Sequence, residues 1–398
     1  MSTPKLTAEQ QYLDLKSKYP DCILFFRMGD FYEVFDNDAR EMSKVLGLTL
    51  TSRDKGEKKR PMAGIPHHAL NQYLGKIVNL GYKVAIAEQM EDAKFAKGIV
   101  KREVTKVVTA GTLIDEKNLQ EQESNFILAL NYSKYKNSIV WGLSYLELST
   151  GEFKLIELET SQNYLAQNKL PSKIIDKIST LQPREILLPE KLKYFLTPII
   201  QTRLTLIEEF QFDFDISYKN IIQHFKLANL VGFGIENYKI AIGAAGVILN
   251  YVKTSEKTEL SHITKLVFDN FSENMNFDFA TIRSLELIEP INLSNLNSDK
   301  PTTLLGVLDK TKTPMGKRLI RSWVLKPLTN LAQIQNRLDN VENFLKLDND
   351  NKLVISNSLD NIYDIERICG RIGLQTISPK DFVALDGSIS EILNLIQT

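Results

Sequence analysis

The feature that most constrains the fold is the pair Gly29-Asp30, which separates two apolar runs. The run before it, residues 22–26 (CILFF), has the length and composition of a buried strand. Glycine can adopt the positive φ that the first position of a two-residue hairpin turn requires. The pair therefore predicts a β-hairpin whose second strand begins at Phe31.

Alternation along the second strand predicts an unusual surface. Side chains in a strand point to opposite faces in turn, so Phe31, Glu33 and Phe35 would share one face, with Tyr32 and Val34 on the other. A phenyl ring is a flat apolar wedge, and a carboxylate beside it can accept hydrogen bonds. Such a pair can enter a DNA groove, with the ring between base steps and the carboxylate at a base edge. The ordinary alternative is a core Phe beside a solvated Glu.

Composition sets limits on function. The chain has 398 residues, of which 49 are basic and 49 acidic, so its net charge is zero. This length predicts two to four domains, and a hydrophobic fraction of 43% is ordinary for well-packed globular protein. If the chain binds nucleic acid, the positive charge must therefore be local.

The cysteines and the termini indicate a compartment. Cys22 and Cys369 lie far apart and form neither a disulfide framework nor a zinc pattern, which suits a reducing cytosol. The first residues contain no apolar signal segment, and no apolar stretch is long enough to span a membrane. We expect a cytoplasmic protein with no membrane partner.

Local patterns predict several elements. Thr7 and Gln10 form a capping box, Asp36 or Asn37 is a candidate cap for the next helix, and Pro314 suits a first helical turn. The pattern of apolar residues predicts a second hairpin, formed by residues 138–148 and 151–158. Residues 241–252 form an apolar helix rich in Ala and Gly that should pack closely on a neighbour, and the chain reads as helical from about residue 235.

Four strings carry a family resemblance. They are, in order, residues 26–33 (FRMGDFYE), 61–69 (PMAGIPHHA), 84–89 (VAIAEQ) and 108–112 (VTAGT). Their order and spacing resemble the N-terminal mismatch-binding domain of the MutS family of DNA mismatch repair proteins. The family usually has Pro where this chain has Ala110, which changes the stiffness of a turn and not the assignment.

Later strings extend the resemblance over essentially the whole chain. Residues 148–153 (LSTGEF) resemble the family's connector domain, and residues 304–309, 313–323 and 364–367 resemble its core or lever domain. The implied fold is multidomain α/β plus α. We expect a mixed α/β mismatch-binding domain at residues 1–118, a ribonuclease-H-like α/β connector at 119–235, and an incomplete all-helical core or lever domain at 236–398.

The resemblance gives the Phe and the Glu their roles. It implies that Phe31 is the wedge that stacks on a mispaired base and that Glu33 hydrogen-bonds to that base. Unstacking and kinking cost less at a mismatch or small loop than in paired duplex, so a constant wedge can select such sites without reading sequence.

Affinity must come from contacts to phosphates. Within or beside the family strings, the candidates for the DNA backbone are Arg27, Arg53, Lys55, Met62 and Gly64. Lys58, Lys59 and Arg60 extend the same basic loop, for which the alternative is a merely solvated charged surface.

No enzyme signature is visible in the sequence. A P-loop needs G-x-x-x-x-G-K-[ST], and the Gly-Lys pairs at Gly75-Lys76 and Gly316-Lys317 lack both the preceding Gly and the following Ser or Thr. The resemblance implies that ATP and Mg²⁺ act in an ATPase domain outside this chain, that the full-length protein is a homodimer, and that the repair protein MutL is a downstream partner. We expect no catalytic residue, cofactor or metal in this chain, since His67-His68 has no third ligand at hand.

Two rival functions remain open. A metal-dependent nuclease would use the middle domain, where Glu147 lies at the position of a ribonuclease-H-like catalytic carboxylate; such work needs several converging carboxylates. A protein-interaction scaffold would no longer read DNA. The Phe-x-Glu pair favours mismatch reading, and the short N-terminus favours a bacterial, nucleoid-associated protein over eukaryotic relatives.

Overall fold

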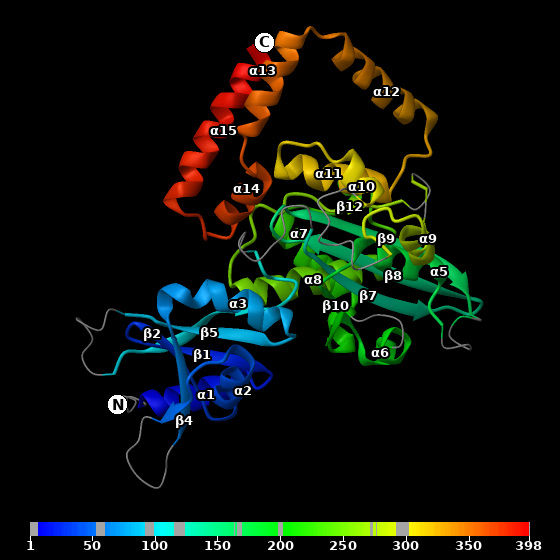
Figure 1. The fold of residues 1–398 in the computed structure, drawn as a ribbon. Helices are drawn as coiled ribbons and strands as arrows, with labels where there is room; N and C mark the ends of the chain where they lie inside the picture. Colours follow the sequence, from blue (N-terminus) through cyan, green and yellow to red (C-terminus); the bar gives the residue numbers. More distant parts are fainter. Residues whose placement is uncertain are drawn as a thin grey trace. The chain divides into compact units, whose positions relative to one another are not determined.

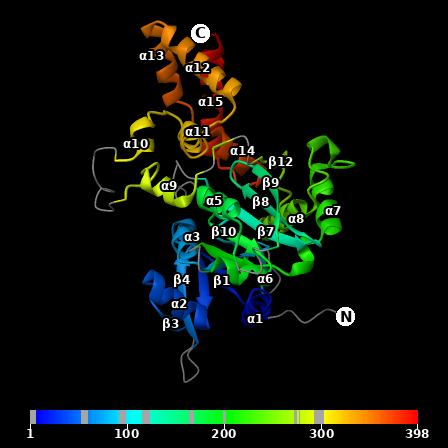
Figure 2. The same cartoon turned by 90° about the vertical axis from the view of Figure 1, so that its right-hand side faces the viewer.

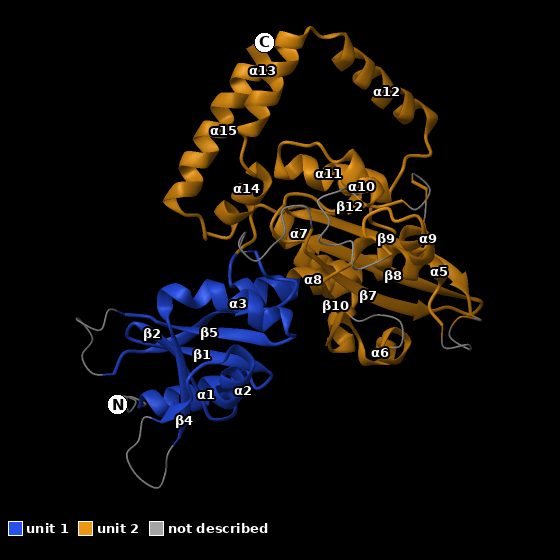
Figure 3. Cartoon of the chain, viewed as in Figure 1, with its two compact units in different colours: residues 1–119, 250–258 blue, residues 120–249, 259–398 orange. Residues whose placement is uncertain are grey.

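The computed structural model describes residues 7–52, 60–91, 99–114, 124–162, 164, 169–197, 202–270, 274–275, 277–291 and 302–397. The chain forms two compact units (Figure 3). Unit 1 contains residues 1–119 and 250–258, and unit 2 contains residues 120–249 and 259–398. The mixed α/β architecture followed by helices is the expected one, whereas the boundaries of the three domains stay a prediction.

Unit 1 is built on a six-stranded mixed sheet of order β3-β4-β2-β1-β5-β6 (Figure 1). Its strands are β1 (Cys22–Met28), β2 (Phe31–Phe35), β3 (Thr51–Ser52), β4 (Pro61–Pro66), β5 (Lys83–Gln89) and β6 (Arg102–Val108). Strand β1 pairs with β5 in parallel, and the other neighbours are antiparallel. The helices are α1 (Ala8–Lys18), α2 (Asp36–Leu46) and α3 (Leu70–Asn79), with the 3₁₀ turn η1 (His67–Ala69) before α3.

Each face of this sheet has its own core. Phe25 and Tyr32 point to the face that α2 and α3 cover. Phe26 and Phe35 point to the other face, where the ring of Tyr12 from α1 packs edge-on against both, at centroid distances of 5.6 and 4.8 Å. Strict alternation along β1 and β2 thus fills two cores from one hairpin.

The two predicted helix starts in this unit have different outcomes. The capping box at Thr7 and Gln10 is confirmed. The prediction that Asp36 or Asn37 caps α2 is wrong, because the N-cap residue is Phe35 and no side chain caps the helix. The carboxylate of Asp36 instead receives hydrogen bonds of 2.5–3.0 Å from the guanidinium of Arg60.

Unit 2 contains a second six-stranded sheet, of order β11-β10-β7-β8-β9-β12. Its strands are β7 (Phe126–Lys134), β8 (Ser138–Glu147), β9 (Glu152–Ser161), β10 (Glu185–Leu188), β11 (Arg203–Leu206) and β12 (Val267–Phe268). The predicted hairpin is confirmed as β8 and β9. The helices around it include α5 (Ser172–Leu181), α6 (Glu190–Leu196), α7 (Phe214–Phe225) and the first part of α8 (Lys239–Glu256), with 3₁₀ turns η3 (Glu209–Phe212) and η4 (Val231–Phe233). The end of α8, from residue 250 on, belongs to unit 1.

Glycines let α8 approach its neighbours very closely, as its composition predicted. A Cβ on Gly243 would lie 2.4 Å from the carbonyl oxygen of Phe212, and one on Gly246 would lie 2.3 Å from the Cβ of Ser217. Gly142 on β8 makes the same kind of approach, since its Cβ would lie 2.3 Å from the carbonyl carbon of Ile240. These contacts leave no room for any side chain on the three glycines.

The segment after residue 235 departs from the helical expectation at β12. This two-residue strand extends the sheet by pairing in parallel with β9, Val267 beside Lys154. The ring of Phe268 stacks on Tyr238 with a centroid distance of 4.1 Å and an interplanar angle of 11°. The strand is too short to show alternation in the sequence, and tertiary pairing decides its conformation.

The C-terminal part is helical. It contains α9 (Phe279–Ser284), α10 (Leu304–Leu308), α11 (Pro314–Leu325), α12 (Leu331–Lys346), α13 (Asn349–Asp360), α14 (Ile365–Gly373) and α15 (Pro379–Gln397). The predicted start at Pro314 is confirmed, with the hydroxyl of Thr313 accepting a hydrogen bond from the Gly316 amide at 3.0 Å. Helices α13 and α15 lie side by side in Figures 1 and 2. No helix in the described residues is long and apolar enough to cross a membrane.

Helix α14 makes close contacts with the sheet of unit 2 and with helix α11. A Cβ on Gly370 would lie 1.9 Å from the carbonyl oxygen of Ser149 in the β8–β9 turn. The buried side chain of Arg318 on α11 donates to both carboxylate oxygens of Asp364, the N-cap residue of α14, at 2.6 and 2.8 Å.

Candidate nucleic-acid interface

The hairpin predicted at Gly29-Asp30 is confirmed. Strands β1 and β2 pair with Met28 opposite Phe31 and Phe26 opposite Glu33, which leaves only the two turn residues between them. Gly29 has φ +62°, the left-handed conformation that the turn needs.

Exposure alternates along β2 as the sequence predicted. The side chain of Phe31 is 49% exposed, whereas Tyr32 beside it is 4% exposed and Val34 is fully buried. Phe35 shares the face of Phe31 yet is buried, because the ring of Tyr12 covers that end of the strand. The face is therefore open only near the turn. Full burial of a Phe side chain stabilises a fold by about 1.5–3 kcal/mol, and the exposed ring of Phe31 gains only part of that stabilisation.

Glu33 lies next to a position without a side chain. It is half-buried, and its partner across the β2–β4 ladder is Gly64. A Cβ on Gly64 would come within 3.6 Å of the Glu33 Cγ. Met62, two residues earlier on β4, pairs with Phe35 and packs against the core of α1, away from the turn. The structure thus brings Gly64 beside Glu33, and not Met62.

Arg27 lies on the opposite face from Phe31 and Glu33. It pairs with Tyr32 across the hairpin, and its guanidinium carbon lies 5.3 Å from the centroid of the Tyr32 ring. Its Nε donates a hydrogen bond to the carbonyl oxygen of Gly29.

The predicted basic loop is described only at its end. Arg53, Lys55, Lys58 and Lys59 lie outside the described residues. Arg60 is engaged within unit 1, since it pairs with Asp36 and Glu9 and lies 5.0 Å from the ring centroid of Phe35.

Three residues near the turn make contacts that the sequence did not predict. The backbone amide of His67 donates to the carbonyl oxygen of Asp30 at 2.8 Å. The hydroxyl of Tyr32 donates to the carboxylate of Glu88 on β5. Burial, and then this hydrogen bond to Glu88, raise the pKa of Tyr32. Both Tyr32 and Glu88 fall within the family strings, but only the strand register shows that they meet.

Glu147, the residue on which a nuclease would depend, has a structural role. It is 1% exposed and receives hydrogen bonds from the Ser149 hydroxyl at 2.7 Å and the Thr150 amide at 2.6 Å. It therefore closes the β8–β9 turn. The described residues contain no group of three or more His, Cys, Asp or Glu side chains placed to hold a metal ion. The nuclease alternative is not favoured.

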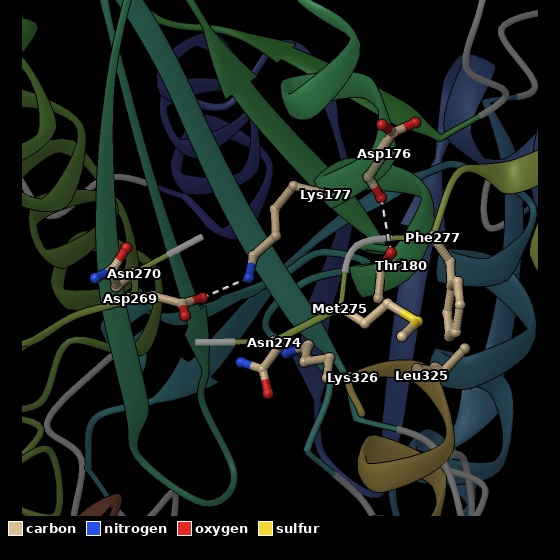
Figure 4. A pocket seen from close by; sticks show the side chains of 10 residues that line it. All are labelled: Asp176, Lys177, Thr180, Asp269, Asn270, Asn274, Met275, Phe277, Leu325 and Lys326. Atoms are coloured by element: carbon tan, nitrogen blue, oxygen red, sulfur yellow. Dashed lines mark hydrogen bonds and ion pairs between the residues drawn. The ribbon is translucent and has the colours of Figure 1, made fainter. Parts of the chain in front are cut away.

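A small pocket with both polar and apolar lining lies in unit 2 among α5, the segment after β12 and the end of α11 (Figure 4). Lys177 forms an ion pair with Asp269, whose carboxylate also accepts a hydrogen bond from Tyr145 at 2.5 Å. Burial and the neighbouring charge of Lys177 lower the pKa of Lys326 to about 8. Thr180, which also lines the pocket, donates to the carbonyl of Asp176 within α5. These groups tie α5, β8 and the segment after β12 together within the unit.

Comparison with known proteins gives a consistent result along the chain. Models of MutS domain I, MutS domain II and MutS domain III match residues 7–117, 125–264 and 280–398. Curated relatives described as DNA mismatch repair protein MutS include those of Alkaliphilus oremlandii (39% identical over 96% of this chain), Ruminiclostridium cellulolyticum (40% over 96%) and Methanosarcina barkeri (37% over 98%). The chain spans 42–43% of the length of these relatives. Three successive domain models and this identity along nearly the whole sequence show that the chain belongs to the MutS family.

Proposed function

We propose that this chain is a mismatch-reading module of DNA repair, in which Phe31 is the wedge and Glu33 contacts the mispaired base. The observation that carries the proposal is the half-exposed Phe31 ring at the turn end of a hairpin, with Glu33 next along the same face. The names of the curated relatives support the same process.

The proposed mechanism follows from the weakness of a mismatch. Inserting a ring between base steps costs unstacking energy, which is smaller where pairing is already defective. Insertion of apolar side chains typically kinks the duplex by roughly 20–90°. A carboxylate held beside the ring can then accept a hydrogen bond from an exposed base edge, which a fully paired base does not offer at that place. Selectivity thus depends on the local weakness of the DNA.

The test compares affinity for a G·T-mismatched duplex and for its paired counterpart, at one salt concentration. Phe31→Ala should abolish the preference for the mismatch. Leu13→Ala is the matched control, because Leu13 is a 51% exposed apolar side chain of the same unit, on α1. Glu33→Gln and Glu33→Ala then separate the negative charge from the hydrogen-bond acceptor.

Each outcome decides between functions. Loss of preference in Phe31→Ala alone establishes the wedge. Equal binding of both duplexes by the wild type, unchanged in Phe31→Ala, would replace this proposal with the protein-interaction scaffold.

For the whole protein we propose the activities that the family resemblance implies. They are ATP binding with Mg²⁺ and hydrolysis in a separate ATPase domain, homodimer formation, and recruitment of the repair protein MutL, all in the bacterial cytoplasm. In this division of labour the present chain binds DNA and catalyses no reaction itself. Pull-down of MutL by the full-length protein on mismatched DNA, with and without ATP, tests the partner and the cofactor together.

A further inference from the structure

We propose that Arg27 is a positioning residue for the reading hairpin and not a phosphate contact, and that it acts with Tyr32 and Glu88. The inference rests on the proposed function of Phe31 and Glu33. It reassigns a residue that the sequence offered as a candidate for the DNA backbone.

Three neighbouring strands place these side chains in one row. Strand β1 lies between β2 and β5. Arg27 on β1 pairs with Tyr32 on β2, and the parallel register of Phe26 with Ala87 puts Glu88 level with Arg27 on the other side. The Tyr32 hydroxyl, which donates to Glu88, therefore passes across β1 at the position of Arg27.

The row engages the guanidinium of Arg27 from two directions. Its carbon lies 5.3 Å from the Tyr32 ring centroid, within the range of a cation–π interaction. Its Nε donates to the carbonyl of Gly29, the first residue of the turn. Glu88 provides a negative charge in the same row. A guanidinium used in this way holds the turn from the face opposite to Phe31 and Glu33.

A second contact holds the other turn residue. The amide of His67, at the start of η1, donates to the carbonyl of Asp30 at 2.8 Å. Both carbonyl oxygens of the two-residue turn are therefore fixed, one by Arg27 and one by His67. A wedge that unstacks bases is pushed back by the duplex, and a functional side chain keeps its geometry only if the residues around it hold it in place.

Substitution with lysine separates the two roles of Arg27. Arg27→Lys keeps the positive charge but loses the planar, forked donor that fits both Gly29 and the Tyr32 ring. If Arg27 positions the hairpin, the preference for a G·T mismatch should fall about tenfold, the effect of one hydrogen bond to a charged group. Affinity for paired duplex and its dependence on salt should not change.

A phosphate contact predicts the opposite pattern. Arg27→Lys would then bind both duplexes like the wild type. Arg27→Met would weaken both equally and reduce the slope of log affinity against log salt by about 1. That pair of results would overturn the inference.

A second variant keeps the test decisive if Arg27 variants fold poorly. Tyr32→Phe retains the ring and removes only the hydroxyl that reaches Glu88. It should lower mismatch preference in the same direction, together with the fluorescence increase of a 2-aminopurine placed beside the mismatch, which reports unstacking. Wild-type values in both assays would contradict the row as a positioning device.

Measuring Phe31→Ala in the same assays separates a failure of the proposed function from a failure of the proposed role of Arg27. If Phe31→Ala keeps mismatch preference, the proposed function itself is wrong. If Phe31→Ala loses it and both Arg27→Lys and Tyr32→Phe retain it, only the role of the row is wrong.

Discussion

Gly64 lies directly opposite Glu33 in the antiparallel register of β2 and β4, and a Cβ there would be 3.2 Å from the Tyr32 carbonyl oxygen and 3.6 Å from the Glu33 Cγ. Gly64→Val should therefore push the Glu33 side chain away from its present position. We expect mismatch preference to fall by about 1–3 kcal/mol, the range of one good contact to a base edge. The strand preference of Val over Gly favours a higher thermal stability, and the close approach of the new Cβ to the Tyr32 carbonyl oxygen opposes it, so we expect the unfolding temperature to change little.

The measurement for Gly64→Val is the ratio of affinities for mismatched and paired duplex, beside the unfolding temperature. Gly64→Ala, with one added carbon, should lie between wild type and Gly64→Val. A Gly64→Val protein with an undiminished ratio would show that Glu33 tolerates displacement.

The contact of Gly370 with the β8–β9 turn predicts a large effect from a single methyl group. Gly370→Ala places a Cβ 1.9 Å from the Ser149 carbonyl oxygen, so backbone must move. Overpacking of this kind costs about 1–3 kcal/mol or more. Gly387→Ala on α15 is the control, because a Cβ there meets nothing within 4 Å; it should stabilise by about 0.5–1 kcal/mol. Urea denaturation of the two variants should shift in opposite directions.

Arg318 and Asp364 form a buried ion pair whose loss should be costly. Their side chains are 8% and 7% exposed. Arg318→Met leaves the Asp364 carboxylate buried without this partner and should destabilise by about 3–5 kcal/mol. Lys312→Met removes an exposed pair with Asp360, 43% and 48% exposed, and should cost less than about 1 kcal/mol. Hydrogen exchange of the α14 amides would locate the effect.

The same pair predicts acid sensitivity. Burial acts to raise the pKa of Asp364, but the hydrogen bonds and charge of Arg318 outweigh it and lower this pKa below 3.8. A lowered pKa in the folded state gives stability that is present above the unfolded-state value and lost as pH falls through the folded-state value. The difference in stability between wild type and Asp364→Asn should therefore shrink only below about pH 4.

His262 predicts a second dependence on pH, at a higher range. Its Nε2 lies 2.7 Å from the Leu148 carbonyl oxygen, while its Nδ1 is buried with no hydrogen-bond partner in the described residues and adjoins Gly373. Burial lowers its pKa from 6.5, although the bond to Leu148 and the charge of Glu147 oppose this. Stability from His262 is thus full above pH 6.5 and is lost as pH falls toward the folded-state pKa.

The check is unfolding of wild type and His262→Gln between pH 8 and pH 5. The wild type should lose more stability than the variant over this range. Parallel curves would mean that His262 ionises in the fold as easily as in the unfolded chain.

Local signals predicted much of the fold and of the site. Gly29 specified the hairpin because few residues adopt its φ, and Thr7 and Pro314 specified helix starts because caps depend on adjacent residues. Asp36 is the first residue of α2 and not its cap, and its carboxylate pairs with Arg60, which is distant in sequence. The row of Arg27, Tyr32 and Glu88 depends on the order of three strands, which no local pattern contains.

That Phe31 and Glu33 contact DNA stays a prediction, but the alternation that exposes Phe31 could be predicted from the sequence. The structural role of Glu147 was not predicted from the sequence. Its carboxylate accepts hydrogen bonds from donors only two and three residues later, in the turn that follows it, whereas the family resemblance had drawn attention to a catalytic role for this position.

The close contacts of the α8 glycines also limit where insertions and deletions can occur in unit 2. One inserted residue rotates everything after it by about 100°, which would replace Gly243 or Gly246 with a side chain at a position where a Cβ already falls within 2.4 Å of Phe212 or Ser217. Residues 241–249 are all buried, so insertions and deletions between residues 239 and 249 should be eliminated by selection. The spacing between Gly243 and Gly246 should therefore be retained in related sequences even where most of the neighbouring residues differ.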